Sequence, residues 1–314
     1  MNKISVIGGG TGLSALLSGL KKLPFDISAI VSVCDDGSST GRLRKEFNTP
    51  AVGDIRKVLI SLSENEKNVG KLFNYRFHTS SDLNGHALGN LLLTGANDLT
   101  GNISDAVKLL NSLLKLKGKV LPLTDDNVTL AAKTKSGKTI FGEHTITESK
   151  EKIESVFYKK NPKVNPEVIK QLKNSDAIIL SMGSLFTSII PNLLCKEIIE
   201  TIDKSNAKII YVCNIMTQPG ETDDFYASTH IELINKYLGK RKIDAVVVNN
   251  GKIDYKIVKN YETKEQKDLV KIDRKKINKL KIKTIENDYI LIKDGMIRHN
   301  SLRVGLDILS YLLD

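Results

Sequence analysis

A glycine-rich segment near the start of the chain constrains the fold more than any other feature of the sequence. Residues 3–7 form a short apolar run that predicts a buried strand, and they lead directly into Gly8-Gly9-Gly10-Thr11-Gly12. An apolar helical pattern follows over residues 13–23, and residues 27–34 predict a second strand, rich in Val, Ile and Ala. Strand, glycine loop, helix and strand in this order predict a βαβ unit with parallel, buried strands.

The same alternation continues through most of the 314 residues. We expect further helices over residues 54–63, 69–73, 90–93, 103–116, 165–172, 187–202, 227–238 and 301–312, and strands over 177–181, 208–213 and 245–248. Repeated βα units predict an α/β fold, here a Rossmann-like, mostly parallel sheet with helices on both faces. Residues 250–290 show no clear pattern.

One stretch interrupts the alternation. Residues 128–134 and 138–141 flank Ser136-Gly137 as two arms of a β-hairpin, and residues 156–158 are a candidate third strand. We therefore expect a small β-rich insertion at residues 118–160, within a single α/β domain that comprises residues 1–314.

Composition limits the class of protein. No stretch is apolar enough for a membrane span, because the nearest candidate, residues 4–20, contains five glycines. The three cysteines are widely spaced, match no metal-ligand pattern and are typical of buried thiols in a cytoplasmic protein. We thus expect a cytoplasmic chain without a metal site of its own, and its oligomeric state, homodimer or otherwise, stays open.

The net charge is +11, and residues 251–283 contain twelve basic and five acidic residues. Most of the basic residues are lysines, which is typical of a solvated surface, and the segment lacks a nucleic-acid motif. We interpret it as a solvated face and expect no nucleic-acid partner.

Arginine is more informative, because the chain has 39 lysines but only eight arginines. Four of the eight fall in one early stretch, at Arg42, Arg44, Arg56 and Arg76. A guanidinium binds phosphate or carboxylate with two parallel hydrogen bonds, which lysine cannot do. The cluster predicts either anion binding or ordinary surface ion pairs.

Ligands of open α/β sheets bind beyond the carboxyl ends of the strands, and three loops at that edge are candidates. The first is the glycine loop, where a backbone approach and a helix N-terminus suit a phosphate group, although tight strand–helix packing would also require glycine. Its Gly10, Gly12 and Ala15 fit the G-x-G-x-x-A pattern of dinucleotide-binding proteins, with Asp35 about 20 residues further on.

The second loop, residues 34–44, offers Asp35 and Asp36 for a ribose hydroxyl, a divalent metal or a substrate hydroxyl, unless it is only an Asp-Gly turn. Neighbouring side chains on a strand point in opposite directions, so we expect at most one of the two aspartates to face a ligand. The third region combines residues 181–184 with residues 214–222, where Ser184 and free N–H groups before Thr187 suit an anion. His86 is a candidate base or, more commonly, a buried structural histidine.

These loops together give the chain a recognisable resemblance. It resembles the YvcK family of bacterial gluconeogenesis factors, within the wider CofD-like group. The matching motifs are IGGGTGLS (7–14), DDGSSTGRLRKEF (35–47), GDIRKVL (53–59), LFNYRF (72–77), GHALGNLLL (85–93), GSLFTSIIPNLL (183–194), YVCNIMTQPGET (211–222) and IRHN (297–300). They occur in family order over about residues 1–300, and residues 250–283 are the least similar part.

The resemblance implies a cytoplasmic protein that binds a UDP-sugar, notably UDP-N-acetylglucosamine, and that supports cell shape and wall synthesis during growth on gluconeogenic carbon sources. Its enzymatic relatives are magnesium-dependent transferases that move phospholactate from a guanosine diphosphate donor. The implied nucleotide-binding residues are Gly9, Gly10, Thr11, Gly12, Asp36, Asp54, Asn90, Gly183, Ser184, Asn214 and Thr217. To these we add Arg44, from the arginine cluster, and expect Arg44 or a neighbouring arginine to balance the charge of the diphosphate.

Three motifs depart from the family pattern. The family usually has GPGS where this chain has Ser181-Met182-Gly183-Ser184, DDGGS where it has residues 35–39, and HSLGN where it has residues 86–90. The second change indicates that a position favouring a positive φ has moved.

Our leading hypothesis is a nucleotide-sugar-binding regulator without catalytic activity. The first alternative is an Mg²⁺-dependent, phospholactate-type transferase that uses the same pocket, since positioning and charge neutralisation suffice for phosphoryl-type transfer. An NAD-dependent oxidoreductase is a weaker alternative, suggested only by the glycine pattern.

Overall fold

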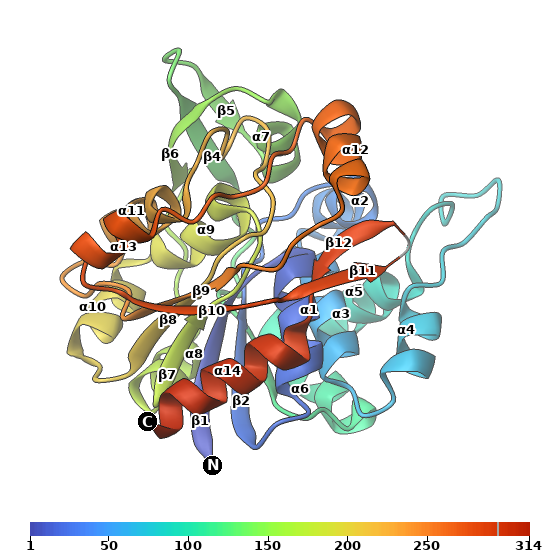
Figure 1. Cartoon of the computed structure of the whole chain (residues 1–314). Helices are drawn as coiled ribbons and strands as arrows, with labels where there is room; N and C mark the ends of the chain where they lie inside the picture. Colours follow the sequence, from blue (N-terminus) through green and yellow to red (C-terminus); the bar gives the residue numbers. More distant parts are fainter. Residues whose placement is uncertain (294) are drawn as a thin grey trace.

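A seven-stranded parallel sheet forms the centre of the molecule, in the order β10-β9-β8-β7-β1-β2-β3 (Figure 1). The computed structural model describes residues 1–293 and 295–314. The strands are β1 (Asn2–Gly8), β2 (Phe25–Val31), β3 (Lys119–Pro122), β7 (Ala177–Leu180), β8 (Lys208–Val212), β9 (Ala245–Asn249) and β10 (Lys283–Asn287). The chain runs outward from β1 to β3 and then returns beside β1 with β7, which is the Rossmann strand order extended by one strand. The predicted α/β fold is confirmed.

Two groups of helices cover the sheet. In one group α14 (Ser301–Leu313) packs along α1 (Gly10–Leu20), and α1 packs along α3 (Gly53–Leu62), as Figure 1 shows. The second group comprises α8 (Pro166–Lys173), α9 (Ile190–Leu193), α10 (Lys196–Lys204) and α11 (Ala227–Tyr237), which pack in succession. Because parallel crossovers are right-handed, a sheet that grows in opposite directions from its centre receives helices on both faces.

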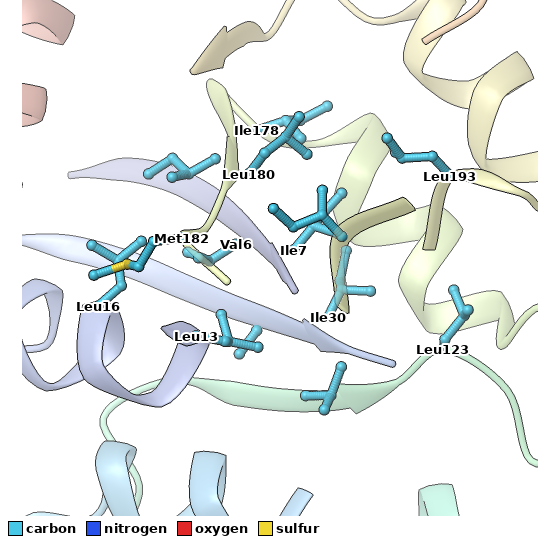
Figure 2. Packing of buried hydrophobic residues seen from close by; sticks show 14 of the residues in the cluster. Val6, Ile7, Leu13, Leu16, Ile30, Leu123, Ile178, Leu180, Met182 and Leu193 are labelled. Atoms are coloured by element: carbon cyan, nitrogen blue, oxygen red, sulfur yellow. The ribbon is translucent and has the colours of Figure 1, made fainter. Parts of the chain in front are cut away.

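The core lies where β1 meets its two neighbours. Val6 and Ile7 of β1 are fully buried between β2 and β7, as Figure 2 shows. Leu13 and Leu16 of α1 pack against this part of the sheet. A strand buried on both faces has mostly apolar residues at successive positions, which explains Ile4, Val6 and Ile7; the one polar residue of this run, Ser5, is buried and hydrogen-bonded to Ser175.

The β-rich insertion is a three-stranded antiparallel sheet in the order β5-β4-β6. It consists of β4 (Leu130–Thr134), β5 (Thr139–Phe141), α7 (Glu143–Ser149) and β6 (Ile153–Tyr158). The predicted hairpin and third strand are therefore present. The insertion begins later than residue 118, however, because β3 pairs with β2 in the main sheet.

Two expected helices differ in the structure, and a region without an expected element contains three. The helix after the glycine loop begins at Gly10 rather than Leu13, so Gly10, Thr11 and Gly12 form its first turn. The helix expected over 187–202 is divided into a π-helical turn η1 (Leu185–Ile189), α9 and α10, with Cys195 extended between the last two. Residues 250–290 contain α12 (Tyr255–Glu265), α13 (Arg274–Lys279) and β10.

The remaining elements lie around the edges. Helices α2 (Ser38–Phe47), α4 (Glu66–Phe73), α5 (Leu88–Thr100) and α6 (Ile103–Leu114) belong to the half of the sheet that contains β2 and β3. A hairpin of β11 (Ile290–Lys293) and β12 (Met296–His299) precedes α14. Among the described residues, every helix is too short or too polar to cross a membrane.

Candidate functional site

A pocket of about 390 Å³ opens where the chain reverses its direction across the sheet, between the loops that follow β1 and β7. In sheets of this type ligands bind at that position. Six predicted site residues line the pocket: Thr11, Gly12, Gly183, Ser184, Asn214 and Thr217. They come from three separate loops, after β1, β7 and β8, and the strand order brings them together.

Close backbone packing joins the two central loops. A Cβ atom at Gly12 would overlap the carbonyl oxygen of Met182 and lie 2.7 Å from its carbonyl carbon. Glycine is thus required at residue 12 because another loop occupies the space. Gly10 differs, because its φ is +61° and an added Cβ would lie 3.6 Å from the Asp54 carboxylate oxygens, which is ordinary contact.

The loops that follow β7 and β8 are joined by one amide side chain. Asn214 accepts a hydrogen bond from the N–H of Gly183 at 2.8 Å and donates one to the Gly183 carbonyl at 2.7 Å. Gly183 has a φ of +147°, which glycine adopts without strain. Asn214 therefore positions the pocket wall, and its amide has fewer free hydrogen-bonding groups for a ligand.

Ser184 has a different role from the one that we expected. Its hydroxyl donates to Glu221 at 2.5 Å and accepts from the backbone N–H of Thr187 at 2.9 Å. Glu221 also accepts from the backbone N–H of Phe186 and from the Gln218 amide. The N–H groups that we expected to bind an anionic ligand thus face a carboxylate of the protein itself. Burial of Glu221 raises its pKa to about 7.

Four carboxylates gather on the other side of the glycine loop. An added Cβ at Gly9 would lie 3.1 Å from Asp54, which also pairs with Lys57 at 3.0 Å. Asp36 accepts the backbone N–H of His144 at 2.8 Å, so it binds the start of α7 in the insertion. Desolvation, followed by the charges of Asp35, Asp54 and Asp36, raises the pKa of Glu143 to about 7.

We name Asp35, Asp36, Asp54 and Glu143 the acidic cluster, because the charges of the three aspartates act on Glu143. That at most one of the two neighbouring aspartates faces a ligand stays a prediction. Burial and the charge of Asp54 also raise the pKa of Asp35. The sequence did not indicate that Glu143 belongs to this cluster, because Glu143 lies in the insertion, more than 85 residues after Asp54.

Arg44 is a structural residue in this arrangement. It is 7% exposed, and its Nη1 donates to the carbonyls of Cys34 and Asp35 at 3.0 Å. Its Nε and Nη2 donate to the Asn127 side chain, and Nη2 also donates to the Val128 carbonyl. All five N–H groups of the guanidinium are used, which leaves none for the diphosphate that we expected it to bind.

Asn90 and His86 are connected through Ser39. The Asn90 amide donates to the Ser39 hydroxyl at 3.1 Å, and that hydroxyl lies 3.0 Å from Nδ1 of His86. Both side chains are buried and the Asn90 Oδ1 has no hydrogen-bond partner. Burial lowers the pKa of His86, so this histidine is neutral at physiological pH.

The basic segment contributes to the pocket, which sequence reasoning missed. Lys267 lines it, together with Tyr261 and Glu265, and the β12 residues Arg298 and His299 form another part of the wall. The interpretation of residues 251–283 as only a solvated face is therefore incorrect. Thr217 fixes this segment in place, since it exchanges two hydrogen bonds with the backbone of Asp268.

A second pocket of about 330 Å³ continues along the same edge of the sheet. It shares Asn214 and Ile215 with the first and extends past β9 to Asn250 and Lys271. The two pockets together provide room for an elongated ligand with several chemical groups.

The chain matches known proteins over nearly its whole length. The family model described as 2-phospho-L-lactate transferase CofD matches residues 4–290. A gluconeogenesis factor of Bacillus subtilis is 42% identical over 304 residues and covers 96% of each chain. A gluconeogenesis factor of Halalkalibacterium halodurans is 40% identical, over 98% of this chain and 95% of the relative.

A solved structure agrees with the same assignment. The crystal structure of a UPF0052 family member from Bacillus halodurans superposes with a TM-score of 0.94 at 40% sequence identity. The match covers 98% of this chain and 100% of the other. The fold described above is thus that of a full-length relative rather than of a shared fragment.

Proposed function

The chain is a gluconeogenesis factor of the CofD family, and on that premise we propose that it binds a nucleotide-sugar of the UDP-N-acetylglucosamine type as a regulator. In this role it supports cell shape and wall synthesis during growth on gluconeogenic carbon sources, without catalysing a reaction. The diphosphate lies at the first turn of α1, and the uridine and sugar extend along the carboxyl edge of the sheet.

The observation that supports this proposal most is the pocket at the reversal point of the sheet. Thr11 and Gly12 line it from the N-terminal turn of an eleven-residue helix, where free N–H groups and the helix dipole favour an anion. The first turn of α1 has no acidic residue of its own, and the carboxylate beside Gly9 and Gly10, that of Asp54, is paired with Lys57.

Two cations balance the charge of the diphosphate in this proposal. Lys267 and Arg298 both line the pocket, and they replace Arg44, whose donors are used elsewhere. Lys267 pairs with Glu265 at 2.6 Å, so a bound diphosphate would compete with that carboxylate for the ammonium group. An anionic ligand therefore contacts Lys267 only after this surface pair separates, which costs about 1 kcal/mol or less.

Ligand-dependent thermal stabilisation tests the proposal. UDP-N-acetylglucosamine at 100 times its Kd should raise the free energy of unfolding by about 2.7 kcal/mol, which is a shift of several degrees in Tm. UDP alone should bind more weakly, and uridine should bind weakly to wild type and to Lys267→Ala alike. Equal stabilisation by UDP-sugar, GDP and NAD would contradict a specific nucleotide-sugar site.

A phosphoryl-type transferase remains the second candidate, because the acidic cluster lies directly beside the glycine loop. Carboxylates that raise one another's pKa favour a nearby cation. Among the described residues, however, no three carboxylate, histidine or cysteine side chains converge closely enough to ligate a metal. Asp54 and Asp36 each have a partner within the protein, so these residues do not fit a preformed Mg²⁺ site and we derive no step through one.

Turnover assays separate the two candidates. A transferase should release product when a nucleotide diphosphate donor, an alcohol acceptor and Mg²⁺ are mixed, and Asp54→Asn should abolish the release. A regulator should bind the UDP-sugar and leave it intact over prolonged incubation, in the wild type and in Asp54→Asn alike.

A further inference from the structure

The donors of Arg44 are all used by carbonyl and amide oxygens of the protein, so three of the four clustered arginines remain to be explained. Arg241 and Arg274 form ion pairs with Asp244 and Glu286. Within the part of the chain that the structure describes, Arg42, Arg56 and Arg76 form no ion pair. Ordinary surface ion pairing, the simpler reading of this cluster, does not explain these three residues.

The three arginines belong to one region of the fold. Arg42 lies on α2, Arg56 lies on α3, and Arg76 follows α4. Helix α5 contacts both α2 and α3 in this part of the molecule (Figure 1). The stem of Arg56 packs on the start of α5, where a Cβ at Gly89 would lie 2.9 Å from its Cδ.

Two of the guanidiniums are fixed by one turn. Arg42 donates to the carbonyl of Asn84 at 2.6 Å, and Arg76 donates to the carbonyl of Gly85 at 2.6 Å. Because these carbonyls belong to consecutive residues, the two guanidiniums bind neighbouring peptide groups of one turn. Each uses one of its five N–H groups there, and the others are available to a ligand.

The third guanidinium is buried without hydrogen bonds. Arg56 is 6% exposed, and its Nε and Nη1 are inaccessible and unpartnered. Burying such a donor costs free energy unless something compensates for it. The charge of Arg76 disfavours the charged form further and, after burial, lowers the pKa of Arg56. Among the described residues, Nη2 of Arg56 also has no hydrogen-bond partner, but it is not fully inaccessible. It is therefore the donor that a ligand can reach.

We propose that Arg42, Arg56 and Arg76 form a second anion site, which binds the phosphate of a small phosphate monoester or inorganic phosphate. The site is distinct from the nucleotide-sugar pocket, because none of these three arginines lines that pocket, although the charges of Asp54 and Asp35 reach Arg56 from the acidic cluster. Guanidinium groups bind phosphate with paired, charge-assisted hydrogen bonds, and a dianion offsets the mutual repulsion of three positive charges.

The depth of Arg56 favours a small ligand over a nucleic acid. A duplex or a long single strand contacts exposed side chains, such as Arg42 and Arg76. Arg56 is too buried for a polymer backbone to reach without rearrangement. A phosphate group that enters beside the turn at residues 84–85 contacts the two exposed guanidiniums first and Arg56 last.

Phosphate-dependent thermal stability, measured at constant ionic strength, tests the site. Inorganic phosphate and methyl phosphate should stabilise the wild-type protein saturably in the millimolar range. Arg76→Ala should raise the apparent Kd about 10-fold, which corresponds to one lost charge-assisted hydrogen bond. Arg56→Lys retains the charge but loses the paired donors of the guanidinium, and it should also weaken phosphate binding. Arg303→Ala is the matched control, because this exposed arginine likewise donates to a carbonyl, that of Asp288 at 2.7 Å.

The outcomes separate this site from the nucleotide-sugar pocket. Arg76→Ala should leave UDP-sugar affinity unchanged, and Lys267→Ala should leave phosphate affinity unchanged. Phosphate binding that is lost in Lys267→Ala would place the anion in the first pocket and overturn the proposal. Equal phosphate affinity in Arg76→Ala and Arg303→Ala would overturn it as well. So would salt-dependent binding of single-stranded RNA that Arg76→Ala abolishes and phosphate does not compete away.

Discussion

Replacing Glu221 by glutamine should change how the stability of the protein depends on pH. Glu221 is 5% exposed, and burial raises its pKa from 4.5 to about 7. A carboxyl group with a raised pKa binds more protons in the folded chain than in the unfolded chain at intermediate pH. The wild-type protein should therefore lose stability as the pH rises from about 4.5 to about 7, and it should lose no more from this group above that range.

The magnitude follows from the size of the shift. A change from 4.5 to about 7, at about 1.4 kcal/mol per pH unit, corresponds to ~3 kcal/mol of unfolding free energy. Glutamine does not titrate, so Glu221→Gln removes this contribution. Glu143 contributes a slope of the same sign, but it is present in both proteins and cancels in the comparison.

Denaturant unfolding of both proteins at about pH 5 and about pH 8 measures the effect. Glu221→Gln alters the hydrogen bonds to Ser184 and Gln218 at both pH values, so its baseline stability is not diagnostic. The diagnostic quantity is the difference between the two proteins, which should move by ~3 kcal/mol in favour of the variant at the higher pH. A parallel pH dependence in the two proteins would refute the buried-carboxylate argument.

Three further predictions concern the glycines, the left-handed serine and the basic segment. Gly12→Ala should destabilise the fold by about 1–3 kcal/mol, because the added Cβ overlaps the backbone of Met182. Gly10→Ala should destabilise it by about 1–2 kcal/mol, through strain at a φ of +61°. A smaller Tm loss in Gly12→Ala than in Gly10→Ala would contradict this order. Ser38 has a φ of 44°, so Ser38→Gly should raise the unfolding free energy by about 1 kcal/mol, and an unchanged Tm would show that this backbone is unstrained. Lys267→Ala should weaken UDP-sugar binding about 10-fold in calorimetric titrations, whereas Lys275→Ala, an exposed change in the same segment, should not.

The central half of the fold could be predicted because its sequence signals are strong and local. Residues 4–7 and 27–31 are buried on both faces of the sheet, so mainly apolar runs without polar alternation mark them, each with a single serine. The strand β10 lacked such a signal. It lies at the edge of the sheet with one neighbour, its residues Lys283–Asn287 are exposed or only half-buried, and its sequence KTIEN reads as a polar stretch.

The site could be predicted only as far as single loops reveal it. The glycine loop and the motif around Asn214 both line the pocket, as their positions after strands indicated. The partner of Ser184 could not be inferred, because Glu221 is 37 residues away and looks like part of a Pro-Gly turn. Arg44 was assigned to a ligand because composition shows where arginines cluster, but not which carbonyls they reach.

The central position of β1 has a consequence for the synthesis of the chain. β1 is made first, and β2 pairs with one of its edges soon afterwards. Its other edge pairs with β7, which begins only at Ala177. At the usual pace of translation, this hydrogen-bonding edge stays open for about 10–30 s on the ribosome. The N-terminal half thus emerges as an unfinished sheet with an apolar strand at its border, which makes it a substrate for chaperones and a starting point for aggregation. Slower translation after β3 would lengthen that interval, whereas a circular permutant that begins at α8 would complete both edges of β1 sooner.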